Sequence, residues 1–324
     1  MKSNDAATVR PNFSQGKMKI IRLICMLLLA GSVLGADETP EVILLLQKLR
    51  AGGVRSAYET SKVPFYIDCW SNSVTLYPGA TNVTWESLQQ PGNPVEKLLD
   101  QVQANNNAKS VAVLARPDSV QVFRQVRKMV GVRQIDVSYD VVDAGQKLGA
   151  TNTPSPAVHI GRAPAGMEKQ PMLFECRNEQ VFFVDKIELD EKIAQMLAAL
   201  KPGEFNGDPN GFVKATSRNE IGNAYYKVVP SYLAAMIMAI ELKPGARGDD
   251  KNALPDPNRN FQRWLRKFNS NTTYLLFVVR DDSFNIFRQA REIADKVGFE
   301  VNWELLKRDE PIKFGNNGKI TTDP

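Results

Sequence analysis

The chain has 324 residues, which is enough for two domains of ordinary size. Its residues are 43% apolar, 8% aromatic and 24% charged, a composition typical of a globular protein and not of a disordered or membrane-embedded one. The formal net charge is +5, but residues 1–36 contain five basic residues and one acid, which leaves +1 for the rest. The body of the chain therefore lacks the long-range positive field that attracts DNA or an anionic membrane, and we expect no nucleic-acid partner.

Residues 1–36 have the layout of a secretory signal peptide. Lys17, Lys19 and Arg22 form a positive region, residues 23–34 are uncharged and apolar, and small residues end the segment at Ala36. An uncleaved anchor is the alternative, although the apolar run is shorter than the ~20 residues that span a bilayer. We expect an exported protein, periplasmic or secreted, with no membrane span once the signal is cleaved.

Two cysteines and one histidine lie beyond this leader. Cys69 and Cys176 each fall on the apolar face of a predicted strand, which favours buried thiols, while a disulfide between them is the alternative in an oxidising compartment. His159 is the only histidine, so a site built from several histidines is excluded. The sequence shows no phosphate loop, nucleophile elbow or zinc motif, and we therefore assign no cofactor, no metal site and no catalytic residue.

One stretch of the sequence occurs twice. RPDSVQVFRQVRK begins at Arg116, and RDDSFNIFRQARE begins at Arg280, 164 positions later. The register holds without a gap over 116–142 and 280–306. Chance similarity over so many elements in the same order is improbable, so the sequence predicts an internal duplication.

Each copy is predicted to fold as a β-β-α-β-α-β unit of the α+β class. Alternating apolar residues predict two strands from 62 and from 169, and an i, i+3, i+4, i+7 apolar stripe predicts a helix over 95–102 and over 261–268. The third strands, 111–115 and 274–279, are almost wholly apolar, so both of their faces should be covered. Helices should begin near Ser119 and Ser283, and the alternating last strands, 135–141 and 299–305, should have one wet face.

The predicted organisation follows from these elements. It comprises a signal peptide (1–36), an N-terminal helical segment (37–61), repeat 1 (62–145), a linker (146–168), repeat 2 (169–310) and a disordered tail (311–324). Repeat 2 carries a helical insertion over 185–258, in which we expect one amphipathic helix through Leu189 and Ile193 and another over 233–240. The insertion is either a partner surface or, more simply, a subdomain that covers the second sheet.

Four arginines are candidate binding residues. Arg116 and Arg280 lie where a buried strand turns into a helix, a place where an arginine beside free N–H groups can hold a carboxylate or a phosphate. The structural alternative is that this motif serves to cap the helices through Asp118 or Ser119 and their counterparts in the second copy. Arg124 and Arg288 lie on the polar face of the following helices, which also carries Arg127 and Arg291. The alternative to a basic binding strip on this face is a solvated surface.

The order of elements, with Ala115-Arg116-Pro-Asp-Ser or Val279-Arg280-Asp-Asp-Ser between a buried strand and an amphipathic helix, resembles the periplasmic domain of the ExbD/TolR family of envelope energy-transducing proteins. The resemblance covers about 80 residues of the first copy and the matched parts of the second. It implies a protein-binding or cell-wall-proximal module. It does not imply proton coupling, because the apolar segment 23–36 lacks the acidic residue on which that work depends in the family.

The sequence thus predicts a non-enzymatic exported scaffold or binding protein, whose partner is an envelope protein or a cell-wall component. The copies should pack on each other, or the chain should form a homodimer through them. The alternative is an exported enzyme that uses carboxylates and arginines between the repeats or under the insertion.

Overall fold

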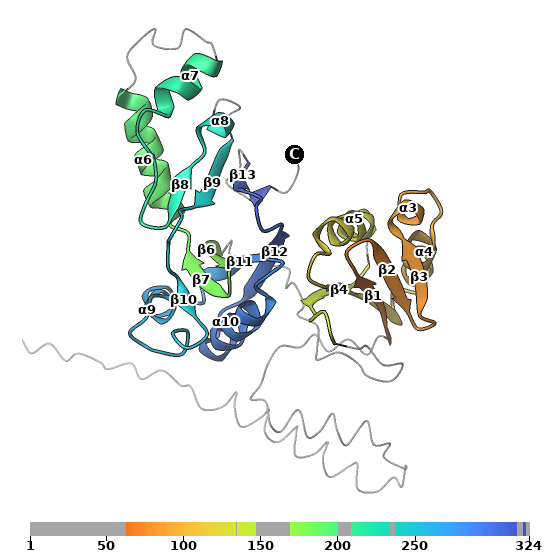
Figure 1. Cartoon of the computed structure of the whole chain (residues 1–324). Coiled ribbons are helices and arrows are strands. Elements are labelled where there is room, and N and C mark those ends of the chain that lie inside the picture. Colours follow the sequence, from red (N-terminus) through yellow and green to blue (C-terminus); the bar gives the residue numbers. More distant parts are fainter. Residues whose placement is uncertain are drawn as a thin grey trace, which may run out of the picture. The chain divides into compact units, whose positions relative to one another are not determined.

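The structure, a computed structural model, describes residues 63–133, 135–146, 169–199, 209–233, 237–315 and 320–321. These residues form eight helices and three sheets, which confirms the mixed α+β class (Figure 1). Among them, no helix has the length and apolar character needed to cross a membrane. The predicted signal peptide, the helical segment 37–61, His159 and the linker beyond residue 146 lie outside the described residues.

The first sheet has five strands in the order β3-β2-β1-β4-β5. Strands β1, β4 and β5 run parallel, whereas β2 and β3 form an antiparallel meander on β1. Their bounds are β1 Val63–Cys69, β2 Ser73–Tyr77, β3 Thr81–Thr84, β4 Lys109–Ala115 and β5 Val137–Val141.

Three helices belong to this sheet: α3 (Trp85–Leu88), α4 (Pro94–Ala104) and α5 (Val120–Gly131). Helix α4 begins where the side chain of Asn93 accepts the N–H groups of Val95 and Glu96. The apolar stripes of α4 and α5 pack with alternate strand residues, including Ile67 and Val113, in one buried cluster. The helices therefore cover one face of the sheet (Figure 1).

The second sheet has the order β10-β7-β6-β11-β12, with the same pattern of strand directions as the first. Its elements are β6 Gln170–Arg177, β7 Gln180–Phe183, β10 Asp249–Asp250, α9 Asn260–Lys267, β11 Thr273–Arg280, α10 Phe284–Val297 and β12 Val301–Leu306. Each sheet thus has an edge strand, β3 or β10, that the predicted β-β-α-β-α-β order lacks. Strand β3 buries one side chain and β10 has two residues, so neither has the apolar alternation by which strands are recognised.

The insertion in the second unit is only partly helical. It contains α6 Lys186–Ala199, α7 Pro209–Thr216, β8 Tyr226–Val228, α8 Pro230–Leu233 and β9 Met238–Leu242. The predicted helix through Leu189 and Ile193 corresponds to α6, but the helix predicted over 233–240 is wrong, because α8 ends at Leu233 and a strand follows. The spacing of the apolar residues in this short segment fits either period, and pairing with the C-terminal strand decides it.

The C-terminal segment completes a third sheet. Strands β13 (Ile312–Phe314) and β14 (Ile320–Thr321) join β9 and β8 in the order β14-β13-β9-β8, so the expectation of a disordered tail from residue 311 does not hold for these strands. Ile312 and Phe314 are buried. They are too few to give a periodic signal in the sequence, and their partner strand is more than 70 positions away.

The third sheet covers the face of the second sheet that is opposite the helices. Tyr226, Ile240 and Ile312 belong to one buried cluster with Val278 and Leu306 of the second sheet. This confirms, for β11, the expectation that an almost wholly apolar strand is covered on both faces. It also supports the simpler interpretation of the insertion, in which it covers the second sheet.

Candidate functional site between the two sheets

Arg116 is bound by a buried carboxylate at the end of the first sheet. It directly follows β4, and the parallel pairing of β1 with β4 brings Asp68 beside it. The guanidinium donates to Asp68 Oδ1 from Nε at 2.8 Å and to Oδ2 from Nη2 at 3.0 Å, with Arg116 2% and Asp68 0% exposed. Burial raises the pKa of Asp68, and the bonds from Arg116 oppose that rise.

The same guanidinium also holds the chain that leaves the sheet. It donates to the carbonyl oxygens of Asp143 at 2.6 Å and Gln146 at 2.8 Å, just after β5. Its outer side is covered by the Trp70 ring, whose centroid lies 3.9 Å from the guanidinium carbon. All of these contacts are internal, so the donors of Arg116 are engaged within the fold.

Arg280 makes the equivalent contacts in the second sheet. Its Nε donates to Oε1 of Glu175 at 2.7 Å, and its Nη2 forms an ion pair with the same oxygen at 2.7 Å. Its Nη1 donates to the carbonyl oxygens of Lys307 and Glu310 after β12. The other carboxylate oxygen accepts the hydroxyl of Tyr226 at 2.9 Å. Burial and the charge of Glu175 raise the pKa of Tyr226 well above its usual value, so this hydroxyl keeps its proton and donates.

Ser119 and Ser283 are the N-cap residues directly before α5 and α10, as predicted. Neither serine side chain makes a capping hydrogen bond, so the prediction is wrong about what these hydroxyls bind. The hydroxyl of Ser119 accepts the N–H of Arg116 at 3.0 Å, and that of Ser283 accepts the N–H of Glu179 at 3.0 Å. Both hydroxyls therefore bind backbone N–H groups of the turns at the strand ends. The local sequence does not show that these N–H groups need a partner.

The helix arginines cross from one unit to the other. Arg127 of α5 forms an ion pair with Glu304 of β12, and Arg291 of α10 forms one with Asp140 of β5 at 2.9 Å. The two arginines are 164 positions apart, and so are the two acids, which makes the pairs reciprocal. The interpretation of this helix face as a solvated surface is therefore wrong for these arginines, which face the other unit.

Arg124 and Arg288 add two further ion pairs between the units. Arg124 binds the carboxylate of Glu310 at 2.9 Å and the carbonyl of Leu305 at 3.1 Å. Arg288 binds both carboxylate oxygens of Asp143, at 2.6 and 2.7 Å. The four arginines thus hold the segments at and just after the last strands of the opposite unit.

An apolar contact accompanies the ion pairs. The ring of Phe123 on α5 stacks on Trp303 of β12 with centroids 5.4 Å apart, and Phe287 of α10 meets the same indole at 5.9 Å. One continuous hydrophobic cluster contains residues of both units. The last strand of the first unit has no wet face, contrary to expectation, because Ser138 and Asp140 are buried.

A shallow hollow of about 270 Å³ lies where the two repeated motifs meet. It is lined by Ser71, Asp118, Val120, Gln121, Asp281, Lys307, Arg308 and Asp309. Burial raises the pKa of Asp281, and the nearby charges of Asp118 and Asp282 raise it further. The hollow is thus lined by charged groups of both signs.

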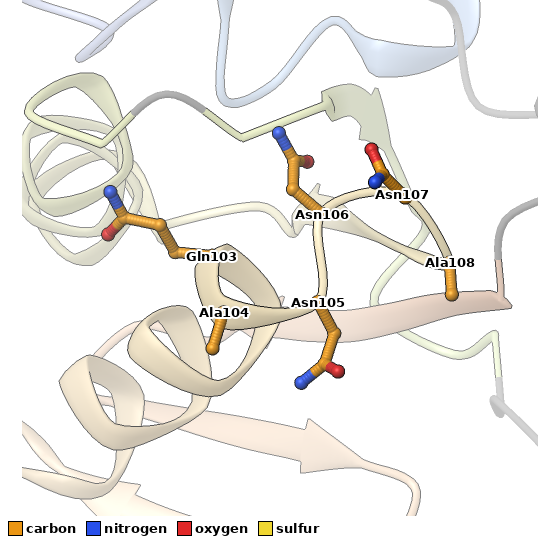
Figure 2. A pocket seen from close by; sticks show the side chains of 6 residues that line it. All are labelled: Gln103, Ala104, Asn105, Asn106, Asn107 and Ala108. Atoms are coloured by element: carbon orange, nitrogen blue, oxygen red, sulfur yellow. The ribbon is translucent and has the colours of Figure 1, made fainter.

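A second hollow, of about 330 Å³, lies at the turn between α4 and β4 and is lined by residues 103–108. Figure 2 shows the side chains of Asn105 and Asn106 pointing to opposite sides of this turn. Such diverging amides do not converge on a common ligand. This hollow is therefore a weaker candidate than the one at the repeated motifs.

Cys69 and Cys176 are free and fully buried. Burial raises the pKa of both thiols well above the usual value, and the adjacent acids Asp68 and Glu175 add to the effect. Both behave as core residues. Among the described residues, no group of three potential ligands is arranged to hold a metal ion.

Four acids that bind the arginines were not predicted as site residues: Asp68 and Glu175 within the two sheets, and Asp140 and Glu304 between the units. A signal was available for the first two, because an acid directly precedes the cysteine of the first strand in both copies. The other two carried no such signal, since a polar residue in an alternating strand usually faces water.

Comparisons with models of protein families, with curated proteins and with solved structures gave no match.

Proposed function

We propose that the chain is an exported, non-enzymatic scaffold or binding protein in which two copies of one α+β unit pair within a single chain. The observation that carries this proposal is the reciprocity of Arg127–Glu304 and Arg291–Asp140. A two-fold interface between identical subunits makes contacts in this way, with residue i meeting j and residue j meeting i. The chain places both partners of such an interface in one polypeptide.

The duplication itself is part of the proposal, and several features support it. The two sheets share strand order and direction, and each ends in a buried arginine–carboxylate pair at an equivalent position. A duplicated packing unit would retain the arginine–carboxylate pair in both copies and would differ at other positions. The chain that links the units then serves to fix their ratio at one to one.

The resemblance to the periplasmic domain of the ExbD/TolR family supports an envelope setting, and the leader-like residues 1–36 support export. Under this proposal the partner is an envelope protein or a cell-wall component, and a homodimer of the chain is a further arrangement. The buried arginines serve the fold, so the partner is bound by exposed surfaces of the paired units.

The proposal is tested by cross-linked capture from an envelope extract with two forms of the mature chain, the wild type and Asp140→Arg. The substitution places two arginines together and should separate the units. We expect a recurrent partner with the wild type and a loss of at least tenfold with the variant. A wild-type chain shown to be folded that captures no recurrent partner would remove the support for a binding role.

The hollow at the repeated motifs favours one second candidate, an exported enzyme that uses Asp118 and Asp281. Asp118 and Asp281 lie close together, and the pKa of Asp281 is raised. Enzymes that use general acid–base catalysis have pairs of acids in this arrangement. Screening of hydrolytic substrates with the wild type and Asp281→Asn tests it. Turnover that the substitution abolishes, without loss of folding, would replace the scaffold proposal.

A further inference from the structure

Helix α9 presents a stripe of four basic residues, Arg259, Arg263, Arg266 and Lys267, which we call the basic stripe. Counted from Arg259, the other three lie four, seven and eight residues further along the chain, which places all four side chains on one side of the helix. All four are exposed. The opposite side buries Phe261 and Leu265. The chain is nearly neutral beyond its leader, so this is a local concentration of charge and not a general property.

The basic stripe is poorly neutralised. Arg259 lies 3.7 Å from Asp256, a long ion pair, with its side chain 61% exposed. Arg266 donates to the carbonyl of Pro257, and Lys267 Nζ lies 4.5 Å from the centroid of the Trp264 ring. Within the described ranges, Arg263, Arg266 and Lys267 form no ion pair with a carboxylate.

The fold does not require this charge, as the equivalent helix of the first unit shows. On α4 the four matching positions are Asn93, Lys97, Asp100 and Gln101, with no net charge. Asn93 caps α4 with its side chain, whereas Arg259 stands at the same position of α9 without a capping bond. Asp249 instead accepts the N–H of Phe261 at 2.6 Å.

At the N-terminal end of α9, Arg259 also opposes the helix dipole, whereas Arg266 and Lys267 lie in the last turn, where the dipole favours a cation. The local rules of helix stability therefore favour Asn93 of α4 over Arg259 of α9. Helix stability accounts for the two cations of the last turn, but it does not account for Arg259 or for the gathering of all four cations on one exposed side, which points to a function outside the fold.

We propose that the basic stripe docks on an anionic phospholipid surface. The rings of Trp264 and Phe268 pack against the core, with Trp264 stacked on Phe183 at a centroid distance of 3.8 Å, and both remain partly exposed beside the stripe. Lys267 Nζ lies within 6 Å of both ring centroids. Tryptophan beside lysine and arginine suits the headgroup layer of a bilayer, where the ring and the cation both find partners. This inference rests on α9 alone and does not depend on the pairing of the two units.

Co-sedimentation of the full chain with vesicles tests the proposal, with vesicles of pure phosphatidylcholine compared with vesicles that contain phosphatidylglycerol. We expect binding to the anionic vesicles only. Each Lys or Arg near a membrane surface contributes about a factor of five in affinity, so Lys267→Gln should weaken binding about fivefold. A variant with the residues of α4, Arg259→Asn with Arg266→Asp and Lys267→Gln, should lose it.

The matched control is Lys97→Gln on α4, which should leave vesicle binding unchanged. Any attachment through residues 1–36 is common to all variants, so the differences report on α9. The triple variant gains a capping residue at position 259 and loses two favourable cations of the last turn, so it should unfold at a denaturant concentration close to that of the wild type. A lost binding signal together with an unchanged unfolding midpoint cannot be ascribed to unfolding.

Two outcomes would overturn the proposal. In the first, the triple variant binds anionic vesicles as the wild type does. In the second, a single-stranded oligonucleotide binds the chain more tightly than the vesicles and loses affinity in the same variants, which would make the basic stripe a site for a phosphate polymer.

Discussion

Each of the first two sheets has a buried arginine–carboxylate pair, and the aromatic residue that covers this pair differs between the two sheets. In the first, the guanidinium of Arg116 lies under the ring of Trp70, which is 36% exposed. In the second, Glu175 receives the hydroxyl of Tyr226 from the third sheet, at a site without exposure to solvent. The arginine–carboxylate pair is common to the two units, because in both it holds the chain after the last strand, whereas the group that covers the pair differs between them.

The largest expected effect comes from removing the buried arginine that each unit has at the equivalent position, Arg116 or Arg280. Arg280→Leu leaves Glu175 buried without its cation and should lower the free energy of unfolding by about 3–5 kcal/mol, measured by denaturant titration. Arg116→Leu should cost a similar amount. Lys296→Gln, which breaks a pair whose partners are 71% and 66% exposed, serves as the control and should change little. A small effect of both leucine variants would show that the pair is dispensable.

The covers should differ in their contribution to stability. Tyr226→Phe removes the hydroxyl that Glu175 accepts, inside the protein, and should cost about 1–3 kcal/mol. Trp70→Leu removes a partly exposed ring from the guanidinium of Arg116 and should cost about 0.5–1 kcal/mol. The same titrations measure both. If Trp70→Leu proved the more costly change, our account of how the two covers differ would be wrong.

The reciprocal ion pairs should contribute less, since they are only partly buried. A double-mutant cycle of Asp140→Asn with Arg291→Gln should give a coupling free energy of about 1 kcal/mol. The equivalent cycle on Arg127 and Glu304 should give a smaller value, because these side chains are 37% and 20% exposed against 15% and 10%. Zero coupling in both cycles would mean that the units do not meet through these residues.

The smallest expected effect is at Asp281. Its pKa is raised by burial and by Asp118 and Asp282, so the native state holds this proton more tightly than the unfolded chain does. Ionisation therefore costs stability as the pH rises from the usual aspartate range through the raised pKa. Asp281→Asn should raise the free energy of unfolding at neutral pH by less than about 1 kcal/mol.

That gain should vanish on acidification, because the wild-type carboxyl is then protonated in both states. Unfolding curves at several pH values measure it. Glu191→Gln, at an exposed position on α6, is the control and should show no such dependence. A gain that grows as the pH falls would contradict the assigned sign.

The sequence predicted the elements better than their contacts. The apolar stripes of α4, α5 and α10 repeat at the helical period, and β11 is apolar at nearly every position. Local patterns of this kind are enough to predict these four elements. Local reasoning failed for β9 and β13, whose few residues become strands only by pairing with each other.

The sequence identified the arginines of the candidate site, but it identified neither the acids that bind them nor the role of each arginine. Arg116 and Arg280 were recognised from the repeat, whereas their partners Asp68 and Glu175 lie 48 and 105 positions away. Arg127 and Arg291 were assigned to a solvated face because a helix arginine that faces another unit and one that faces water have the same local pattern. Only the distant acids of the last strands distinguish the two cases.

The most direct test of the central claim, that the two units pair within the chain, is a measurement of their tumbling by NMR relaxation of backbone amides. The account predicts one common rotational correlation time for amides of the first and second sheets, and two shorter times in the variant Asp140→Arg with Glu304→Arg. Two different times in the wild-type chain would show that the units move independently and would contradict the account.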